Sequence, residues 1–159
     1  MIFVTVGTQD KQFIRLLQAV DKAIEDGFIN EEVIVQAGCN DYESKNMKIM
    51  KMLSQQEFEK YINECSLLIT HGGVGSIMTG LKYGKKVIAA ARLAKYHEAE
   101  RDHQEEIIKK FENDGNILGA LDLDKLGEVI EKARDFEPKP YVSNTANMVK
   151  LIEDFIDNN

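Results

Sequence analysis

Short apolar runs alternate with segments of helical periodicity along this chain, and this alternation strongly limits the folds open to it. The expected strands are 2–6, 33–35, 47–53, 66–70, 87–91 and 117–118. The expected helices are 10–27, 54–62, 77–84, 102–112, 124–134 and 144–157. Such an order implies right-handed crossovers, so we predict an α/β fold with a Rossmann-like parallel sheet and helices on both faces. At 159 residues the chain is expected to form a single domain, 1–159.

Three short polar patterns predict where helices begin. Asp10 is expected to cap the helix after the first strand, and Ser54 with Glu57 forms a capping box. Asp122 and Asp124 have the spacing of a D-x-D metal motif, but they lie far from the other candidate site residues and at a helix start. N-capping therefore explains them, and no metal site is expected.

Composition and charge narrow the class of protein. Hydrophobic residues make up 43% and charged residues 30%, as in ordinary soluble globular proteins. The net charge of -7 argues against a nucleic-acid partner or an anionic membrane surface, since both require clustered cations. Cys39 and Cys65 are expected to be reduced thiols. The first apolar run is too short for a signal peptide, and no stretch is long enough to span a bilayer, so we expect a cytoplasmic protein.

The segment Thr70-His71-Gly72-Gly73-Val74-Gly75-Ser76 joins a strand to a helix through a glycine-rich turn. Glycines allow a ligand to approach the backbone, and the helix start presents unpaired N–H groups to an anion. The turn is therefore interpreted as a diphosphate cradle. The alternative is a tight strand-to-helix connection with no ligand. Neither the G-x-G-x-x-G fingerprint nor the P-loop Lys-Ser/Thr pair is present.

Candidate site residues gather in the loops that follow the strands. In parallel α/β folds, ligands bind at the carboxyl ends of the strands. Loops 7–9, 71–76 and 92–104 fall there, and the last two contain all three histidines, His71, His97 and His103. Simpler roles stay open, because either His71 or His103 could cap a helix.

The chain resembles the C-terminal, donor-binding half of family 28 glycosyltransferases with the GT-B fold. The resemblance lies in the T-H-G-G-V-G-S segment, the following Y-G-K-K-V-I, Glu98 and the D-H-Q run 102–104. The V-T-V-G-T-Q start and the chain length are similar to the soluble subunits of split glycosyltransferases. Those include the eukaryotic enzyme that makes the chitobiose lipid and bacterial galactosyl- and glucuronosyltransferases of capsule and exopolysaccharide synthesis. The resemblance covers nearly the whole chain.

The resemblance implies which positions face a UDP-sugar donor. The group expected near the diphosphate and nucleotide consists of Gly7, Thr8, Gln9, His71, Gly72, Gly73, Gly75 and Ser76. The group expected near the donor sugar consists of Glu98, Asp102, His103 and Gln104. Where the family places a glutamate that holds the ribose hydroxyls, this chain has the shorter, uncharged Thr79.

The residue types suit departure of a diphosphate without a metal or a further cofactor. Helix N–H groups, the hydroxyls of Thr8 and Ser76, and protonated His71 or His103 are expected to stabilise the leaving group. Inverting transfer also requires a general base, and in GT-B enzymes the other domain usually supplies it. The sequence therefore resembles half an enzyme, and its catalytic base is unassigned.

The resemblance implies a UDP-sugar-binding catalytic subunit of a two-component inverting glycosyltransferase. Its expected partner is a membrane-anchored, acceptor-binding subunit that recruits it to the cytoplasmic face, and its expected acceptor is a polyprenyl-diphosphate-linked saccharide. Helix 144–157, tethered through Pro138 and Pro140, is the expected docking element. The alternative is a non-catalytic nucleotide-sugar-binding or scaffolding subunit. A Rossmann oxidoreductase is disfavoured because the phosphate fingerprint and the ribose-binding acid are missing.

Overall fold

The computed structural model describes residues 1–7 and 10–141. Six strands form one parallel sheet within this part of the chain: β1 (Ile2–Thr5), β2 (Val33–Gln36), β3 (Lys48–Met50), β4 (Leu67–His71), β5 (Val87–Ala90) and β6 (Leu118–Gly119). The helices are α1 (Ile14–Glu25), α2 (Gln55–Glu64), α3 (Val74–Lys82), α4 (His103–Asn113) and α5 (Leu126–Asp135), with 3-10 turns η1 (Ala94–Tyr96) and η2 (Leu123–Lys125). The predicted α/β class and Rossmann-like parallel sheet are confirmed.

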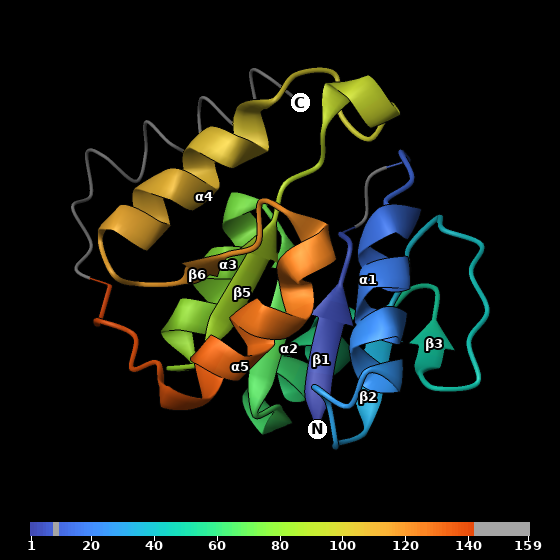
Figure 1. Ribbon diagram of the computed structural model, residues 1–159, viewed down its shortest axis with the longest axis horizontal. Helices are drawn as coiled ribbons and strands as arrows, with labels where there is room; N and C mark the ends of the chain where they lie inside the picture. Colours follow the sequence, from blue (N-terminus) through green and yellow to red (C-terminus); the bar gives the residue numbers. More distant parts are fainter. Residues whose placement is uncertain (8–9, 142–159) are drawn as a thin grey trace.

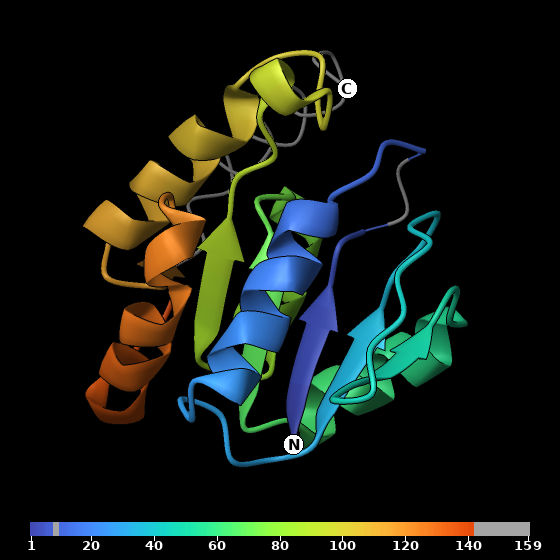
Figure 2. The ribbon, with the colours of Figure 1, turned by 45° about the vertical axis from the view of Figure 1, so that its right-hand side comes forward.

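Helices cover both faces of the sheet (Figures 1 and 2). Alternate side chains of a strand point to opposite faces, so β1 contributes Val4 to one core and Phe3 to the other. Helices α1 and α5 pack on the Val4 face, while α2, α3 and α4 pack on the Phe3 face. The central strands are buried on both sides, which is why they appear in the sequence as continuous apolar runs.

The strand order is β3-β2-β1-β4-β5-β6. The chain builds outward from β1 through β2 to β3, and then returns to the other side of β1 with β4. Because the connections leave β1 and β4 in opposite directions, a crevice opens at the carboxyl ends of these two neighbouring strands. The glycine turn after β4 and Gly7 after β1 both lie at this point.

The start of α1 differs from the prediction. Helix α1 begins at Ile14, and its first turn has no side-chain cap, so the expected cap by Asp10 is wrong. The N–H of Phe13 instead donates to Asn40 Oδ1 at 2.6 Å, from the loop after β2. That partner is 27 positions away in the sequence, so no local capping pattern announces it.

Other boundaries agree with local chemistry. Ser54 Oγ accepts the Glu57 N–H at 3.1 Å, as the capping box predicts. Asp122 accepts the Asp124 N–H at the start of η2, which confirms capping as its role. The predicted helix 144–157 lies outside the described residues. Within the part that is described, no helix has the length and apolarity needed to cross a membrane.

Candidate functional site

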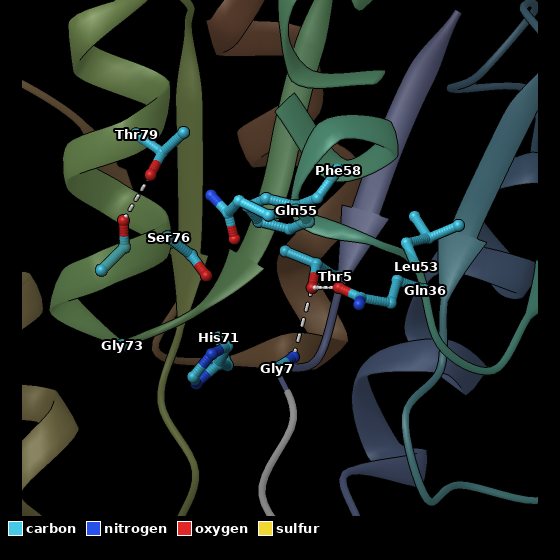
Figure 3. A pocket seen from close by; sticks show the side chains of 11 residues that line it. Thr5, Gly7, Gln36, Leu53, Gln55, Phe58, His71, Gly73, Ser76 and Thr79 are labelled. Carbon is cyan, nitrogen blue, oxygen red and sulfur yellow. Dashed lines mark hydrogen bonds between the residues drawn. The ribbon is translucent and has the colours of Figure 1, made fainter. Parts of the chain in front are cut away.

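A pocket of about 390 Å³ lies at the switch in strand order, between the carboxyl ends of β1 and β4. Figure 3 shows how its walls converge from strands, turns and helix starts. Its lining consists of Thr5, Gly7, Gln36, Leu53, Gln55, Phe58, His71, Gly73, Gly75, Ser76 and Thr79. The structure thus brings together six of the residues expected near a donor, although they come from two distant parts of the sequence.

One wall of the pocket is formed by the start of α3. Gly73 occupies the N-cap position with extended backbone, and no side chain caps the helix. The first-turn N–H groups are therefore available to a ligand, and the helix dipole adds partial positive charge beside Ser76. This wall is suited to an anion such as a phosphate group.

The entry to the loop after β1 is held by a small polar network, drawn in Figure 3. Thr5 Oγ1 donates to Gln36 Oε1 at 2.8 Å and accepts the Gly7 N–H at 3.2 Å. Gly7 has φ of +81°, a left-handed conformation that favours glycine. The following Thr8 and Gln9, both expected near a diphosphate, lie outside the described residues.

The opposite wall was not found by sequence reasoning. Leu53, Gln55 and Phe58 come from the β3–α2 connection and the first turn of α2. Thr5 and Gln36, which end β1 and β2, were missed as well. One signal was available, since polar residues at the carboxyl ends of neighbouring parallel strands meet at the same edge.

His71 ends β4 and stands between two glycines. A Cβ added to Gly7 would lie 2.5 Å from His71 Nε2, and one added to Gly73 would lie 2.4 Å from its Cε1. Burial and the nearby positive charge of Arg92 lower the pKa of His71, and a hydrogen bond from Gln104 raises it. The net result is a pKa of about 3. The imidazole is therefore neutral near pH 7, which argues against the expected protonated His71.

The residues expected near a donor sugar are placed outside the pocket lining. The Glu98 carboxylate accepts a bidentate pair of hydrogen bonds from the Arg15 guanidinium, at 3.0 and 2.8 Å. It also accepts a hydrogen bond from the Leu93 N–H at 3.0 Å. Asp102 accepts the Ala94 N–H at 2.8 Å. Both carboxylates brace the loop that contains η1, with Glu98 itself only 5% exposed.

Gln104, Gly72 and His103 lie beside the pocket rather than in its lining. Gln104 is 2% exposed and contacts the backbone of Gly72 and the ring of His71. Gly72 has no room for a side chain, because an added Cβ would lie 2.8 Å from Gln104 Cβ. His103 Nδ1 lies 3.5 Å from a Glu106 carboxylate oxygen, and its Nε2 is buried without a hydrogen-bond partner.

Arg92 is a structural residue of the site that sequence reasoning missed. Its side chain is fully buried, with the guanidinium 5.4 Å from the centre of the Phe13 ring. It donates to the carbonyl oxygens of Val6, Lys11 and Glu98. Burial lowers its pKa to about 10, so it stays charged at neutral pH. Arg92 thereby ties the loop after β5 to both ends of the loop after β1.

Replacing Arg92 with methionine is expected to lower the free energy of unfolding by about 2–3 kcal/mol, because two buried carbonyl groups and one partly buried carbonyl group lose their donor. Urea denaturation measures this loss. The control is Lys109→Met on the exposed face of α4, with an expected change within about 0.5 kcal/mol. Equal stabilities of the two variants would show that Arg92 does not hold these loops together.

In the described part of the chain, no three His, Cys, Asp or Glu side chains gather as metal ligands would. The observed architecture, with a pocket at the strand-order switch and an open helix N-terminus in its wall, is that of nucleotide-binding α/β domains. The chain belongs to glycosyltransferase family 28, because the model of that family's C-terminal domain matches residues 1–158. Among curated proteins, none matches the chain in sequence.

Similar solved structures include several glycosyltransferases. The glycotransferase of kitacinnamycin has a TM-score of 0.63 and 13% identity, over 83% of this chain and 34% of that one. SnogD from Streptomyces nogalater has a TM-score of 0.55 and 19% identity, over 97% of this chain and 43% of its own. ALG13 has a TM-score of 0.61 and 20% identity, over 94% of this chain and 93% of ALG13.

These likenesses establish the fold, the Rossmann-like C-terminal half of the GT-B architecture. The chain spans only 34% and 43% of the first two proteins, but 93% of ALG13.

Proposed function

We propose that this chain binds a UDP-sugar as the catalytic donor subunit of a two-component inverting glycosyltransferase. The observation that carries the proposal is the pocket at the β1–β4 switch, which has an uncapped helix start at one end and an apolar wall at the other. Membership of family 28 supports glycosyl transfer as the reaction.

The diphosphate is assigned to the end of the pocket formed by Gly7, His71 and the start of α3. First-turn N–H groups of α3 and the Ser76 hydroxyl would donate to its oxygens, and the neutral His71 ring would add one more donor. These donors are held in place before charge develops on the leaving group, which favours breaking of the bond between sugar and phosphate. Thr8 and Gln9 remain proposed contacts of the same group.

The nucleobase is assigned to the wall formed by Leu53, Gln55 and Phe58. Phe58 packs edge-on against Phe3, with ring centres 5.8 Å apart, so this apolar wall is anchored to the core. An apolar surface with one amide suits a flat, polar-edged ring such as uracil. The donor sugar would then point away from this wall, toward the loops that contain Glu98, Asp102 and His103.

Ribose recognition gives a test at Thr79. Its hydroxyl donates to the Gly75 carbonyl at 2.8 Å, so it is already engaged within α3. Thr79→Glu is expected to tighten UDP about three- to tenfold, through hydrogen bonds to the ribose hydroxyls. The gain for 2′-deoxy-UDP should be smaller, and calorimetric titration of both ligands measures the difference. An equal gain in affinity for UDP and 2′-deoxy-UDP would show that the ribose does not bind beside residue 79.

We assign the acceptor half to a partner subunit, and the correspondence of this fold to the C-terminal half of the GT-B architecture supports that assignment. The proposed partner is a membrane-anchored subunit that supplies the general base and a polyprenyl-diphosphate-linked saccharide, at the cytoplasmic face, in capsule or exopolysaccharide synthesis. The segment 144–157, predicted from sequence to be a helix, is the proposed docking element. The ALG13 likeness supports this division of labour, since ALG13 is matched over nearly its whole length.

Calorimetric titration of the full chain with UDP tests the proposal. Saturable binding that one of UDP-galactose, UDP-glucuronate and UDP-N-acetylglucosamine tightens would support a donor subunit and identify its sugar. Turnover of that donor only with the membrane partner present separates a catalytic subunit from a scaffold. Absence of UDP binding with and without the partner would reject the proposal.

A further inference from the structure

We propose that Gln104 is a positioning residue that sets the tautomer of His71, so that the imidazole presents its Nε2–H to the pocket. The effect of this tautomer on binding rests on the proposed function, since the group that accepts the Nε2–H hydrogen bond is taken to be a diphosphate. The tautomer itself follows from hydrogen bonds within the chain and is measurable without any ligand.

The orientation of the Gln104 amide is determined by its backbone partners. Two N–H groups, those of Gly72 and Arg92, converge on the same end of the amide, each at 3.0 Å. An N–H group can only donate, so the atom that receives both must be the carbonyl oxygen, Oε1. The amide cannot be flipped without placing its NH₂ group against two other donors.

That orientation determines the protonation of the His71 ring. The Gln104 NH₂ group lies 3.2 Å from His71 Nδ1 and can only donate to it. Nδ1 must therefore be the unprotonated acceptor, and in a neutral imidazole the hydrogen is then on Nε2. The lowered pKa of His71 agrees with a neutral ring.

The Nε2 side of the ring faces the pocket. Nε2 lies 2.5 Å from the Cβ position of Gly7 and 2.8 Å from that of Gly73, where Cε1 is closer at 2.4 Å, and all three residues line the pocket. Figure 3 shows the ring between these two glycines. Because Gly7 and Gly73 have no side chains, neither of these two residues places one over this nitrogen, and Nε2–H is a fixed donor aimed at the proposed diphosphate position.

Gln104 connects three elements. It lies in the first turn of α4, and its side-chain amide accepts the N–H groups of Gly72, just after β4, and Arg92, just after β5. With 2% of its surface exposed, it has little access to a sugar. Its effect on the donor is thus exerted through His71, whereas the resemblance had implied direct sugar contact.

The first test is the tautomer of His71 in the ligand-free full chain, by long-range ¹H–¹⁵N correlation of the histidine rings at pH 7. Comparison with His71→Asn assigns the signals. We expect a single Nε2–H form in the wild type. An Nδ1–H form, or a mixture of both, overturns the inference whether or not UDP binds, and failure of UDP binding alone leaves this result standing.

The second test is the variant Gln104→Glu. One carboxylate oxygen still accepts the N–H groups of Gly72 and Arg92, but the NH₂ group that donated to His71 Nδ1 is replaced by an oxygen that accepts. Neutral His71 must then carry its hydrogen on Nδ1 and present an Nε2 lone pair to the ligand. We expect UDP to bind about tenfold more weakly than to the wild type at pH 8. The ratio should approach one at pH 6, where the new carboxylate favours imidazolium and restores Nε2–H.

The matched control is Gln55→Glu, the same change in the pocket wall at a residue other than the Gln104 that bonds the His71 ring. Its affinity ratio to the wild type is expected to be constant between pH 6 and 8. A constant ratio for Gln104→Glu as well would overturn the positioning role. If Gln104→Glu does not fold, Gln104→Met replaces it, and there the ring spectrum should change from one tautomer to a mixture.

Discussion

Gly73→Ala is expected to weaken UDP binding by about 100-fold or more, because a single methyl group would displace the His71 ring. The backbone at Gly73 has φ of -79°, which any residue adopts, so conformation is not the obstacle. The added Cβ would lie 2.4 Å from His71 Cε1, so the buried ring would have to shift to admit it. Moving the ring breaks its contact with Gln104 and removes one donor from the pocket. Titration calorimetry measures the loss.

A clash of this kind also destabilises the fold, so the control must lose stability without touching the pocket. Gly127→Ala meets that need, since its Cβ would lie 2.4 Å from the Phe28 ring. It should lower the melting temperature and leave UDP affinity unchanged. Gly75→Ala, whose Cβ meets nothing within 4 Å, should leave stability unchanged or raise it. Normal UDP binding by Gly73→Ala would place the diphosphate elsewhere.

The free energy of unfolding is expected to fall by about 3 kcal/mol between pH 7 and pH 4 because of His71 alone. Its pKa is about 3 in the folded protein and 6.5 for an ordinary histidine, so over this range the unfolded chain binds a proton that the folded chain does not. Stability is therefore fully present above pH 6.5 and is lost as the pH falls toward 3. Urea denaturation at a series of pH values measures this slope.

The comparison for the acid prediction is His71→Gln, which removes the titrating ring. Its stability is expected to change much less between pH 6.5 and 4, whatever its value at pH 7. Asp21 and Glu31, whose pKa values are lowered by hydrogen bonds from side chains or the chain's amino terminus, contribute mainly below pH 4. Parallel curves for the two proteins above pH 4 would mean that another group causes the acid sensitivity.

The glycine turn shows what local sequence could predict about the site. The apolar run before His71 predicts a strand, the glycines permit close approach, and the next periodic segment predicts a helix. Each of these signals lies within a few residues, so the pocket wall at the start of α3 could be predicted. The second wall could not, because Leu53 and Phe58 resemble ordinary core residues until the fold brings the β3–α2 connection and α2 to the pocket at the end of β1.

Glu98 and Gln104 show why roles are harder to predict than positions. Glu98 pairs with Arg15, 83 positions away, and Gln104 contacts Gly72, 32 positions away. A carboxylate or an amide in a loop can serve a ligand equally well or brace a neighbouring loop. Its role depends on which hydrogen-bond donors the fold brings within about 3 Å of it. Local sequence does not reveal those donors.

The apolar alternation by itself determined the α/β class, the parallel sheet and the edge at which the pocket lies, because burial and periodicity act over neighbouring residues. The tertiary structure alone decided the strand order, the second pocket wall and the neutral state of His71. These depend on contacts between distant segments: Arg92 joins the loops after β1 and β5, and Gln104 joins β4, β5 and α4. Burial and hydrogen-bond direction then determine the charge and the tautomer of a ring whose sequence neighbours reveal neither.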